Sequence, residues 1–169
     1  MTQRDDLLRL ENQLCFSAVL ASRAIVSAYR PLLDPLGLTH PQYLVLLALW
    51  ERDPRTVTEL ARELRLDKAT LSPLVKRLEA SGYVTRRRNS DDERVLDVRL
   101  TGAGRALRDS AAEIPAAIMA RLGMDEGRIG QLRDSFDALT AAAMEETAPT
   151  GQTEESGQAR DGTGTTGTG

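Results

Sequence analysis

Apolar residues recur at three- and four-residue steps along most of the chain, the spacing that places them on one face of an α-helix. In the first part of the chain this spacing predicts one long helix over residues 5–33, based on Leu7, Leu10, Leu14, Ala18, Ile25 and Tyr29. A second, mostly apolar helix follows the stretch Thr39-His40-Pro41-Gln42, a capping box with proline in the first turn. We expect this second helix to be central and buried.

Two shorter helices are predicted next, separated by a tight turn. The stretch Thr56-Val57-Thr58-Glu59 is another capping box and begins the first of them. The side chain of Asp67 can cap the next helix, which runs to about Ala80 and ends before Gly82. This pair has the arrangement of a helix-turn-helix.

The pattern then changes to that of strands. Residues 83–88 predict a short strand, and residues 89–93 predict a polar turn. The apolar positions Val95, Val98 and Leu100 predict a returning strand. This segment is therefore expected to be a β-hairpin.

Two further helices are predicted after the hairpin. Thr101 caps the first, which continues through Ile118 and which we expect Pro115 to bend. The last helix covers residues 129–143 and has a narrow apolar seam with alternating steps of three and four.

The order helix, turn, helix and hairpin predicts a winged helix-turn-helix, so the fold is expected to be mainly α with a small β-hairpin wing. Residues 39–100 form the expected DNA-binding domain. The long terminal helices each have one apolar seam and no obvious intrachain partner for their whole length, which is typical of a dimer interface. We therefore expect residues 1–38 and 101–146 to form the helical dimerisation region of a homodimer.

Composition changes this picture at the C-terminal end. The 169-residue chain suits one or at most two small globular units, but residues 147–169 hold 7 Thr, 6 Gly and no large apolar side chain. Such a segment cannot bury enough surface to offset the entropy of ordering, so we predict a disordered tail. Residues 145–169 contain five acidic residues against Arg160, a charge of -4, so the other 144 residues carry +1 of the total of -3. The net negative charge of the chain thus comes from residues 145–169.

The sequence excludes several classes of protein. No stretch approaches the roughly 18 uncharged apolar residues that a membrane helix needs, and the first residues lack the basic and then apolar pattern of a secretory signal. We expect a cytoplasmic protein with no membrane contact. Cys15 and His40 are the single cysteine and histidine, which excludes disulfide scaffolds and zinc fingers. No metal, cofactor or catalytic site is expected, and the chain is not expected to be an enzyme.

Basic residues concentrate in the predicted helix-turn-helix and hairpin. Residues 55–88 contain nine basic and four acidic residues, a local charge of +5. Residues at the start of the second of the short helices are small or polar enough to enter a major groove: Lys68, Ala69, Thr70 and Ser72. Other basic residues are better placed for phosphates, which supply affinity without sequence information: Lys76, Arg77 and Arg86 to Arg88. A solvated surface is the alternative interpretation of the charge run.

The turn of the hairpin carries one arginine of its own. Arg94 follows three acidic residues. An arginine at a wing tip can insert into the narrow minor groove, and the carboxylate of Asp92 can hold its guanidinium in an extended pose. The alternative is an Asp-Arg surface pair that only fixes the turn.

The stretch Leu66–Glu79 (LDKATLSPLVKRLE) is followed by Gly82, Val84 and Arg86 and by the wing sequence Asp91-Asp92-Glu93-Arg94. These motifs resemble the MarR family of winged-helix transcription regulators. Three further stretches are similar to the organic hydroperoxide sensing branch of that family, the OhrR type: Leu10–Phe16, Tyr29–Leu33 and Pro41–Leu44. The resemblance covers about residues 8–144. It implies a homodimer that binds a pseudo-palindromic DNA operator and represses a peroxidase gene, and often its own, until an organic hydroperoxide oxidises Cys15 to sulfenic acid.

Thiol chemistry sets conditions on such a sensor. A thiolate attacks a peroxide far faster than a thiol does, so Cys15 needs nearby hydrogen-bond donors or cations. Tyr29 is fourteen residues further along the same predicted helix, about 21 Å away and beyond a side chain's reach. Because the resemblance makes both residues part of one sensing site, we expect Tyr29 to come from the second subunit. The alternative is that Cys15 is a buried cysteine acting as a small hydrophobe.

Two features depart from the pattern of this branch. The branch usually has a second tyrosine where this chain has His40, which can donate a hydrogen bond or, as a cation, favour the thiolate. The alternative is that His40 only occupies a helix start. With no second cysteine in the sequence, oxidised Cys15 must be capped by a low-molecular-weight thiol, over-oxidised, or cyclised onto a backbone nitrogen.

Three other functions stay open from the sequence. One is a MarR-type repressor released by a small aromatic or phenolic ligand, with Cys15 structural. Another is a thiol peroxidase that uses Cys15 for turnover, although a peroxidase would hardly need a basic winged helix. The third is an architectural DNA binder without a switch.

Overall fold

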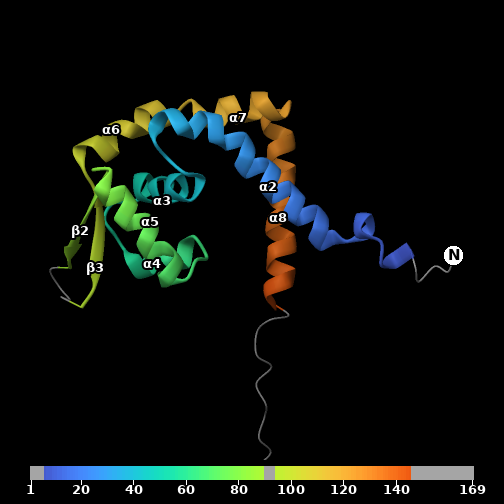
Figure 1. Cartoon of the computed structure of the whole chain (residues 1–169), viewed down its shortest axis with the longest axis horizontal. Coiled ribbons are helices and arrows are strands. Elements are labelled where there is room, and N and C mark those ends of the chain that lie inside the picture. The colour runs from blue at the N-terminus through green and yellow to red at the C-terminus, as the bar shows by residue number, and fades with distance from the viewer. Residues whose placement is uncertain (1–5, 90–93, 146–169) are drawn as a thin grey trace, which may run out of the picture. The chain divides into compact units, whose positions relative to one another are not determined.

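The computed structural model describes residues 6–89 and 94–145 (Figure 1). The chain divides into two compact units. The first unit extends to Glu126, and the second begins at Gly127. The described part of the second unit, residues 127–145, belongs to one helix, α8 (Glu126–Glu145). The tail predicted over residues 147–169 and the wing residue Asp92 lie outside the described residues.

The first unit is mainly helical with one small sheet, as the sequence predicts. Its longer helices are α2 (Leu14–Leu33), α3 (His40–Glu51), α4 (Val57–Glu63), α5 (Lys68–Ala80), α6 (Gly102–Ala111) and α7 (Ile114–Leu122). Two short 3-10 helices flank α2, namely η1 (Leu10–Asn12) and η2 (Asp34–Leu36). The strands are β1 (Arg55–Thr56), β2 (Val84–Arg88) and β3 (Leu96–Leu100).

Helix α2 begins later than predicted. The expected single helix over residues 5–33 is interrupted at Gln13, whose backbone is extended. Side-chain amides compete with the helix there: Gln13 Nε2 donates to the Leu7 carbonyl over 2.5 Å, and Asn12 Nδ2 donates to the Asp6 carbonyl over 2.7 Å. The N-terminal part is therefore a 3-10 turn, and α2 continues without interruption from Leu14 to Leu33.

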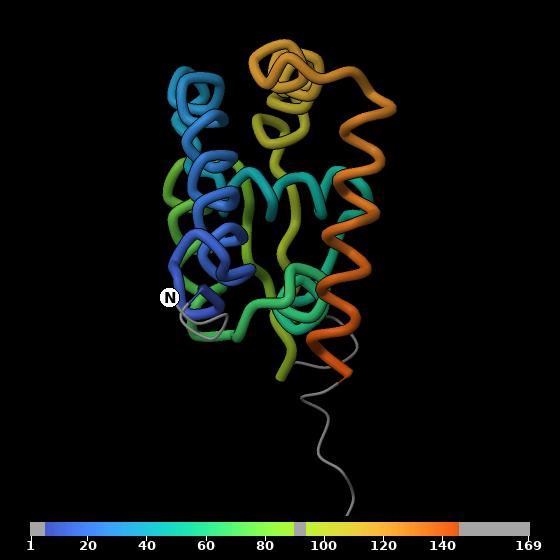
Figure 2. The backbone as a smooth tube through the Cα atoms, turned by 90° about the vertical axis from the view of Figure 1, so that its right-hand side faces the viewer, coloured from blue at the N-terminus to red at the C-terminus, as the bar shows by residue number. Residues whose placement is uncertain are grey.

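Helix α3 is the most buried helix, as predicted. Val45, Leu46 and Leu49 are at most 1% exposed, and α3 packs against α2, α5 and α6. Its start is fixed by Gln42, whose Oε1 accepts from the backbone N–H and the hydroxyl of Thr39 over 2.9 and 2.8 Å. Helices α2 and α7 lie side by side over this core in both views (Figures 1 and 2).

The helix-turn-helix begins with the predicted caps. The Thr56 hydroxyl accepts from the Glu59 backbone N–H over 3.1 Å, and the Glu59 carboxylate accepts from the Thr56 backbone N–H over 2.7 Å. At the far end Gly82 has a φ of 77°, a left-handed conformation that favours glycine. Both predicted boundaries of α5 are confirmed.

The sheet has one strand more than the sequence predicts. Its order is β1-β3-β2 with antiparallel pairing throughout, and Val98 of β3 is paired with Arg55 on one side and with Arg86 on the other. Strand β1 has only two residues, too short for any alternation of apolar and polar positions to reveal it. It joins the start of α4 to the wing.

Pro115 ends a helix instead of bending it. The helix predicted from Thr101 through Ile118 is divided into α6 and α7 at residues 112–113. A proline removes its own backbone donor and clashes with the carbonyl four residues earlier, here that of Ala111, the last residue of α6. Pro115 is tolerated as the second residue of α7 because the first turn of a helix has no such bond to lose.

Helix α8 carries an exposed apolar seam. Leu132, Phe136 and Leu139 lie at the predicted alternating steps and are each about two fifths exposed, at 39%, 41% and 38%. The three-part domain division predicted from the sequence, with dimerisation regions at both ends, stays a prediction. Within the described residues, no helix combines the length and the apolar character needed to cross a bilayer.

Helix α6 is attached to the rest of the first unit by specific bonds near its start. Trp50 Nε1 donates to the Gly104 carbonyl over 2.9 Å. Arg105 pairs with Asp53 over 2.5 Å, and the same carboxylate accepts from the Leu100 backbone N–H over 3.0 Å. A Cβ at Gly104 would collide with the backbone carbonyl of Tyr83, so the close approach of α6 to the wing requires glycine.

We predict that Gly104→Ala destabilises the fold. The added methyl group meets backbone that cannot rotate away, so the free energy of unfolding should fall by about 1–3 kcal/mol. Gly102→Ala is the matched control, because the same helix has open space at that position, and its effect should stay within about 0.5 kcal/mol. Urea unfolding of the two variants measures the difference. Equal stabilities would show that α6 does not approach Tyr83 this closely.

Candidate functional site

The start of α5 is held by a side-chain cap. Asp67 accepts from the Thr70 backbone N–H over 2.6 Å and from the Thr70 hydroxyl over 3.0 Å. These hydrogen bonds lower the pKa of Asp67, so the capping carboxylate is ionised at neutral pH. The cap leaves the first turn of α5 facing solvent.

The residues predicted to enter a major groove lie on this exposed turn. Lys68, Ala69 and Thr70 are exposed and Ser72 is half-buried. The Ser72 hydroxyl donates to the Lys68 carbonyl over 2.7 Å, so it serves its own helix and has only acceptor capacity left. The structure thus brings these residues together at the start of α5, while Leu71, Val75 and Leu78 face the core.

Within residues 6–89 and 94–145, three of the predicted phosphate contacts are free cations. Lys76 and Arg77 are exposed on α5, and within residues 6–89 and 94–145 neither side chain makes a hydrogen bond or an ion pair. Arg87 on β2 is exposed in the same way. These side chains can reach an anionic surface without first breaking a bond to the protein.

Arg86 differs from its neighbours because it is bound to α5. Its Nε and Nη2 lie 2.7 and 2.6 Å from Glu79 Oε2, and its backbone N–H donates to Glu79 Oε1 over 3.0 Å. The Arg86 side chain lowers the pKa of Glu79, which is ionised at neutral pH. An Arg86 engaged in this way is a poor candidate for the phosphate contact that the charge run suggested.

The wing is held near its turn by a buried carboxylate. Asp97, only 3% exposed, accepts from Asn89 Nδ2 over 2.9 Å and from Arg99 Nη2 over 3.1 Å. Both hydrogen bonds lower the pKa of Asp97, and the one from Asn89 has the larger effect. The predicted wing-tip residue Arg94 lines a cavity of about 290 Å³ between wing and α5, together with Lys68, Ser72 and Arg86.

The proposed sensor residues fall into two places along α2. Cys15 is exposed in the first turn, so a single chain does not bury it as a small hydrophobe. Tyr29 is half-buried near the other end, and its ring lies 5.1 Å from that of His40 in an edge-on arrangement and 6.1 Å from that of Tyr43. The structure therefore brings Tyr29 and His40 together, while Cys15 lies about 21 Å away along the same straight element.

Burial sets the protonation of this aromatic group. It raises the pKa of Tyr29, so the phenol keeps its proton and can donate a hydrogen bond. It lowers the pKa of His40, so the imidazole is neutral at pH 7. A neutral His40 can donate a hydrogen bond but does not attract a thiolate as a cation would. His40 is also the first residue of α3. It therefore occupies a helix start and contacts Tyr29 at the same time.

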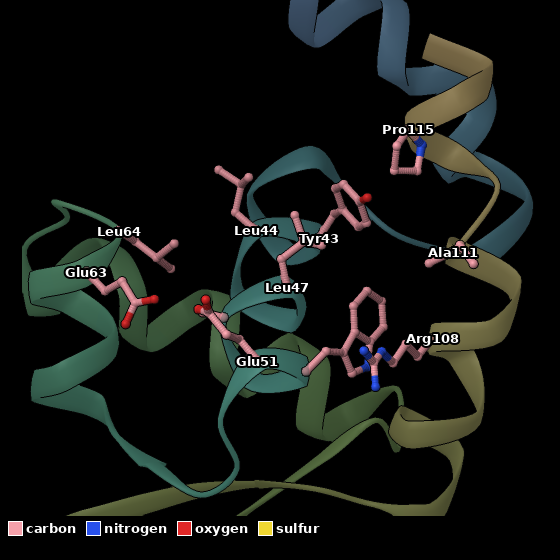
Figure 3. A pocket seen from close by; sticks show the side chains of 12 residues that line it. Tyr43, Leu44, Leu47, Glu51, Glu63, Leu64, Arg108, Ala111 and Pro115 are labelled. Carbon is pink, nitrogen blue, oxygen red and sulfur yellow. The ribbon is translucent and has the colours of Figure 1, made fainter. Parts of the chain in front are cut away.

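Two cavities flank α3. One, of about 500 Å³, lies beside His40 and is bordered by Arg23, Val26 and Arg30 of α2. The other, of about 660 Å³, lies between α3, α4, α6 and α7 (Figure 3). Its walls are mostly apolar, and Glu51, Glu63 and Arg108 supply its charges (Figure 3).

Several polar residues that shape this region are not evident from the sequence. Arg55 is 5% exposed and pairs with Glu51 over 3.1 Å and with Glu63, and Glu79 and Asp97 hold the wing. Each looks like an ordinary charged residue in the sequence. Only the seven-residue separation of Glu79 and Arg86 across the Gly82 turn could have suggested that pair, and spacing across a turn is a weak signal.

Comparison with known proteins gives consistent results. A model of the MarR family matches residues 38–96. The organic hydroperoxide resistance transcriptional regulator of Bacillus subtilis (strain 168) is 40% identical over 139 residues, which cover 82% of this chain and 95% of the relative. These relatives are transcription regulators and not enzymes.

Two solved structures extend the comparison. One is the structure of reduced AbfR bound to DNA; AbfR is a protein of Staphylococcus epidermidis. It is 37% identical to this chain with a TM-score of 0.75, and the match covers 88% of this chain and 100% of the AbfR chain. The same protein has been solved overoxidised on DNA and in a disulfide-formed state. CouR from Rhodococcus jostii RHA1, bound to p-coumaroyl-CoA, is 26% identical with a TM-score of 0.66 and covers 78% of this chain and 94% of its own.

We predict that Arg77→Ala weakens DNA binding on every sequence alike. A free cation that neutralises one phosphate releases about one counterion, so its loss should flatten the dependence of log K on log salt by about one unit per contact. The measurement is fluorescence anisotropy with duplexes of different sequence between low and moderate salt. Arg108→Ala, on α6, is the control and should leave the slope unchanged. A sequence-selective loss would place Arg77 against a base instead.

Proposed function

Because the chain belongs to the MarR family of transcription regulators, we propose that it is a redox-sensing repressor. As a homodimer it binds a pseudo-palindromic operator in double-stranded DNA, and it releases the operator when an organic hydroperoxide oxidises Cys15. The observation that carries this proposal is the half-buried contact between Tyr29 and His40. The imidazole of His40 borders an open cavity, and Tyr29 lies about 21 Å along α2 from the exposed Cys15. The name of the Bacillus subtilis relative supports the choice of oxidant.

A second copy of the chain supplies the missing contact. Helix α2 exposes large apolar side chains that a monomer leaves in water: Leu14, Val19, Leu20 and Val26. Helix α8 exposes a seam of its own. Burying such faces against a partner is favourable by about 25 cal/mol for each Å² of apolar surface. Two α2 helices packed in opposite directions would bring Cys15 of each chain to the Tyr29 end of the other.

The cavity beside His40 fits the start of the partner's α2. Its floor includes Leu33 and Leu38, which are 1% and 4% exposed, and Val26 borders it. An apolar side chain such as Leu14, next to Cys15 in the sequence, would be buried there. The thiol would then lie near the phenol of Tyr29 and the neutral imidazole of His40. Both groups can donate a hydrogen bond to a thiolate.

The reaction at Cys15 is a two-electron transfer. The thiolate sulfur attacks the terminal peroxide oxygen, an S–O bond forms, and the O–O bond breaks. The alkoxide leaves and takes a proton, which gives an alcohol and a cysteine sulfenic acid. Since the sequence holds no second cysteine, a low-molecular-weight thiol then condenses with the sulfenic acid to form a mixed disulfide and water.

The structure offers a route from the sensor helix to the DNA-reading elements. The Tyr83 hydroxyl donates to the Leu36 carbonyl over 3.1 Å, so the segment after α2 is bonded to the residue between α5 and β2. Helix α2 also packs on α3 and α7. A bulky group on Cys15 would disturb the packing between subunits and change the separation of the two α5 helices, which must match half-sites about one helical turn apart.

A second candidate function rests on the 660 Å³ cavity between α3 and α6 (Figure 3). Its volume and apolar walls suit a small aromatic ligand, and CouR is a structural neighbour solved with p-coumaroyl-CoA. In this function a ligand would release the operator and Cys15 would be structural. Cys15→Ser distinguishes the two: it should abolish release by cumene hydroperoxide under the first proposal and leave release by an aromatic acid intact under the second.

We predict that Tyr29→Phe slows oxidation of Cys15 without weakening operator binding by the reduced protein. The ring and its packing stay, and only the hydroxyl donor is lost. The measurement is the loss of free thiol over time with cumene hydroperoxide. Mixed dimers show which subunit acts. When a Tyr29→Phe chain is paired with a Cys15→Ser chain, the single thiol faces an intact tyrosine and should react at the wild-type rate.

The matched control pairs a wild-type chain with a chain carrying both Cys15→Ser and Tyr29→Phe. This dimer also holds one cysteine and one tyrosine, but they are in the same chain, so the thiol faces phenylalanine and should react slowly. The reverse order of rates would show that Tyr29 acts within its own chain. Equal rates in the two mixed dimers would make Tyr29 an ordinary interface aromatic.

A further inference from the structure

In the bond between Glu79 and Arg86, one arginine supplies both donors, whereas the carboxylates of Asp53 and Glu59 each bind one arginine side chain and the backbone N–H of a different residue. Both carboxylate oxygens of Glu79 are used, one by the guanidinium of Arg86 and one by its backbone N–H. The two side chains are 34% and 29% exposed. A chelate of this kind holds a fixed geometry, whereas a simple surface pair between flexible side chains is worth little.

The backbone part of this bond has a specific reason. In the order β1-β3-β2, strand β2 is an edge strand. The N–H of Arg86 therefore points away from β3, and without Glu79 it would have no partner in the sheet. The Glu79 carboxylate occupies this edge and joins the side of α5 to the middle of the wing strand. Residues 81–83 join these two elements along the chain, and α5 and β2 also pack against each other in the core.

The wing carries its reading residue on the other arm of the hairpin. Arg86 is paired with Val98 of β3, and Arg94 precedes that strand. Arg94 and Lys68 line the same 290 Å³ cavity with Arg86. The position of Arg94 relative to the start of α5 thus depends on the angle between hairpin and helix, which both the core packing of α5 on β2 and the bond from Glu79 to Arg86 constrain.

We propose that Glu79 and Arg86 are positioning residues for DNA recognition: their bond sets the distance between the recognition helix and the wing, so that the two fit neighbouring grooves together. Arg86 acts through this bond and does not neutralise a phosphate. The proposal rests on DNA binding by the winged helix but not on the chemistry of Cys15. It can therefore fail or hold independently of the redox function.

The test is a double-mutant cycle with Arg94→Ala, using the full chain kept reduced. The probe is a duplex of about 30 base pairs selected from a random pool by the wild-type protein, long enough for two half-sites. In the wild-type background Arg94→Ala should weaken binding by about tenfold or more. In the Glu79→Gln background the wing is already misplaced, so the same change should cost much less. Equal losses in both backgrounds, within about twofold, would overturn the proposal.

The charge of Arg86 is tested separately. Arg86→Lys keeps the charge but loses the planar fork that chelates Glu79. It should lose as much specific affinity as Arg86→Ala, and neither variant should flatten the salt dependence on random DNA. A lysine that restores affinity, or a slope that falls by about one unit with alanine, would make Arg86 a phosphate contact. Arg87→Ala, at the exposed neighbouring position that can meet a phosphate, is the positive control and should flatten the slope by about one unit.

Two further measurements separate the positioning role from a change of net charge and from a general binding defect. Glu113→Gln removes the same charge from an exposed site outside the helix-turn-helix and the sheet, so it shows how much a change of net charge alone alters affinity. Hydroxyl-radical footprints report where contact is lost: Glu79→Gln should lose protection in the flanking minor grooves and keep it where α5 binds. Uniform loss of protection would indicate a general defect and contradict the positioning role. If Glu79→Gln does not fold, the cycle is run with Arg86→Lys in its place.

Discussion

The packing of α3 against α2, α5 and α6 is the interaction on which the rest of the first unit depends. Val45, Leu46 and Leu49 are almost completely buried, and each such side chain contributes about 1.5–3 kcal/mol relative to exposure. Because an interior packed at crystal density transmits displacement, the helix that carries Cys15 and the helix that would read DNA share one core through α3. If the sensing helix and the DNA-reading helix belonged to separate cores, a displacement of one would not be transmitted to the other by packing.

The elements with local signals could be predicted from the sequence, and those that depend on tertiary partners could not. Capping boxes at Thr39 and Thr56 and the cap at Asp67 mark helix starts correctly because each acts within three residues. The two-residue strand β1 has no pattern of its own. Likewise the interruption at Gln13 comes from side-chain bonds to earlier carbonyls, which periodicity does not reveal.

The candidate site shows the same division. Exposure of Lys68, Thr70 and Arg77 follows from the helical face on which they lie, and it could be predicted. The engagement of Arg86 could not, because a count of charges does not show which of them are already paired. Arg55 is a second case, since it is buried between two glutamates. The local charge of +5 therefore overstates the number of cations that can meet a phosphate, although the net charge is unchanged.

The hydrogen bond from Tyr83 to the Leu36 carbonyl sets a limit on how the segment after α2 can influence the wing. One such bond contributes about 0.5–1.5 kcal/mol, which changes an equilibrium constant by about tenfold at most. Moving a two-state population from almost fully bound to almost fully free requires about 5.5 kcal/mol. A switch that used this bond alone would change operator binding only gradually and only over a small range. A sharp response needs many contacts of α2 to change at once, so its steepness is a property of the shared core and not of any single link.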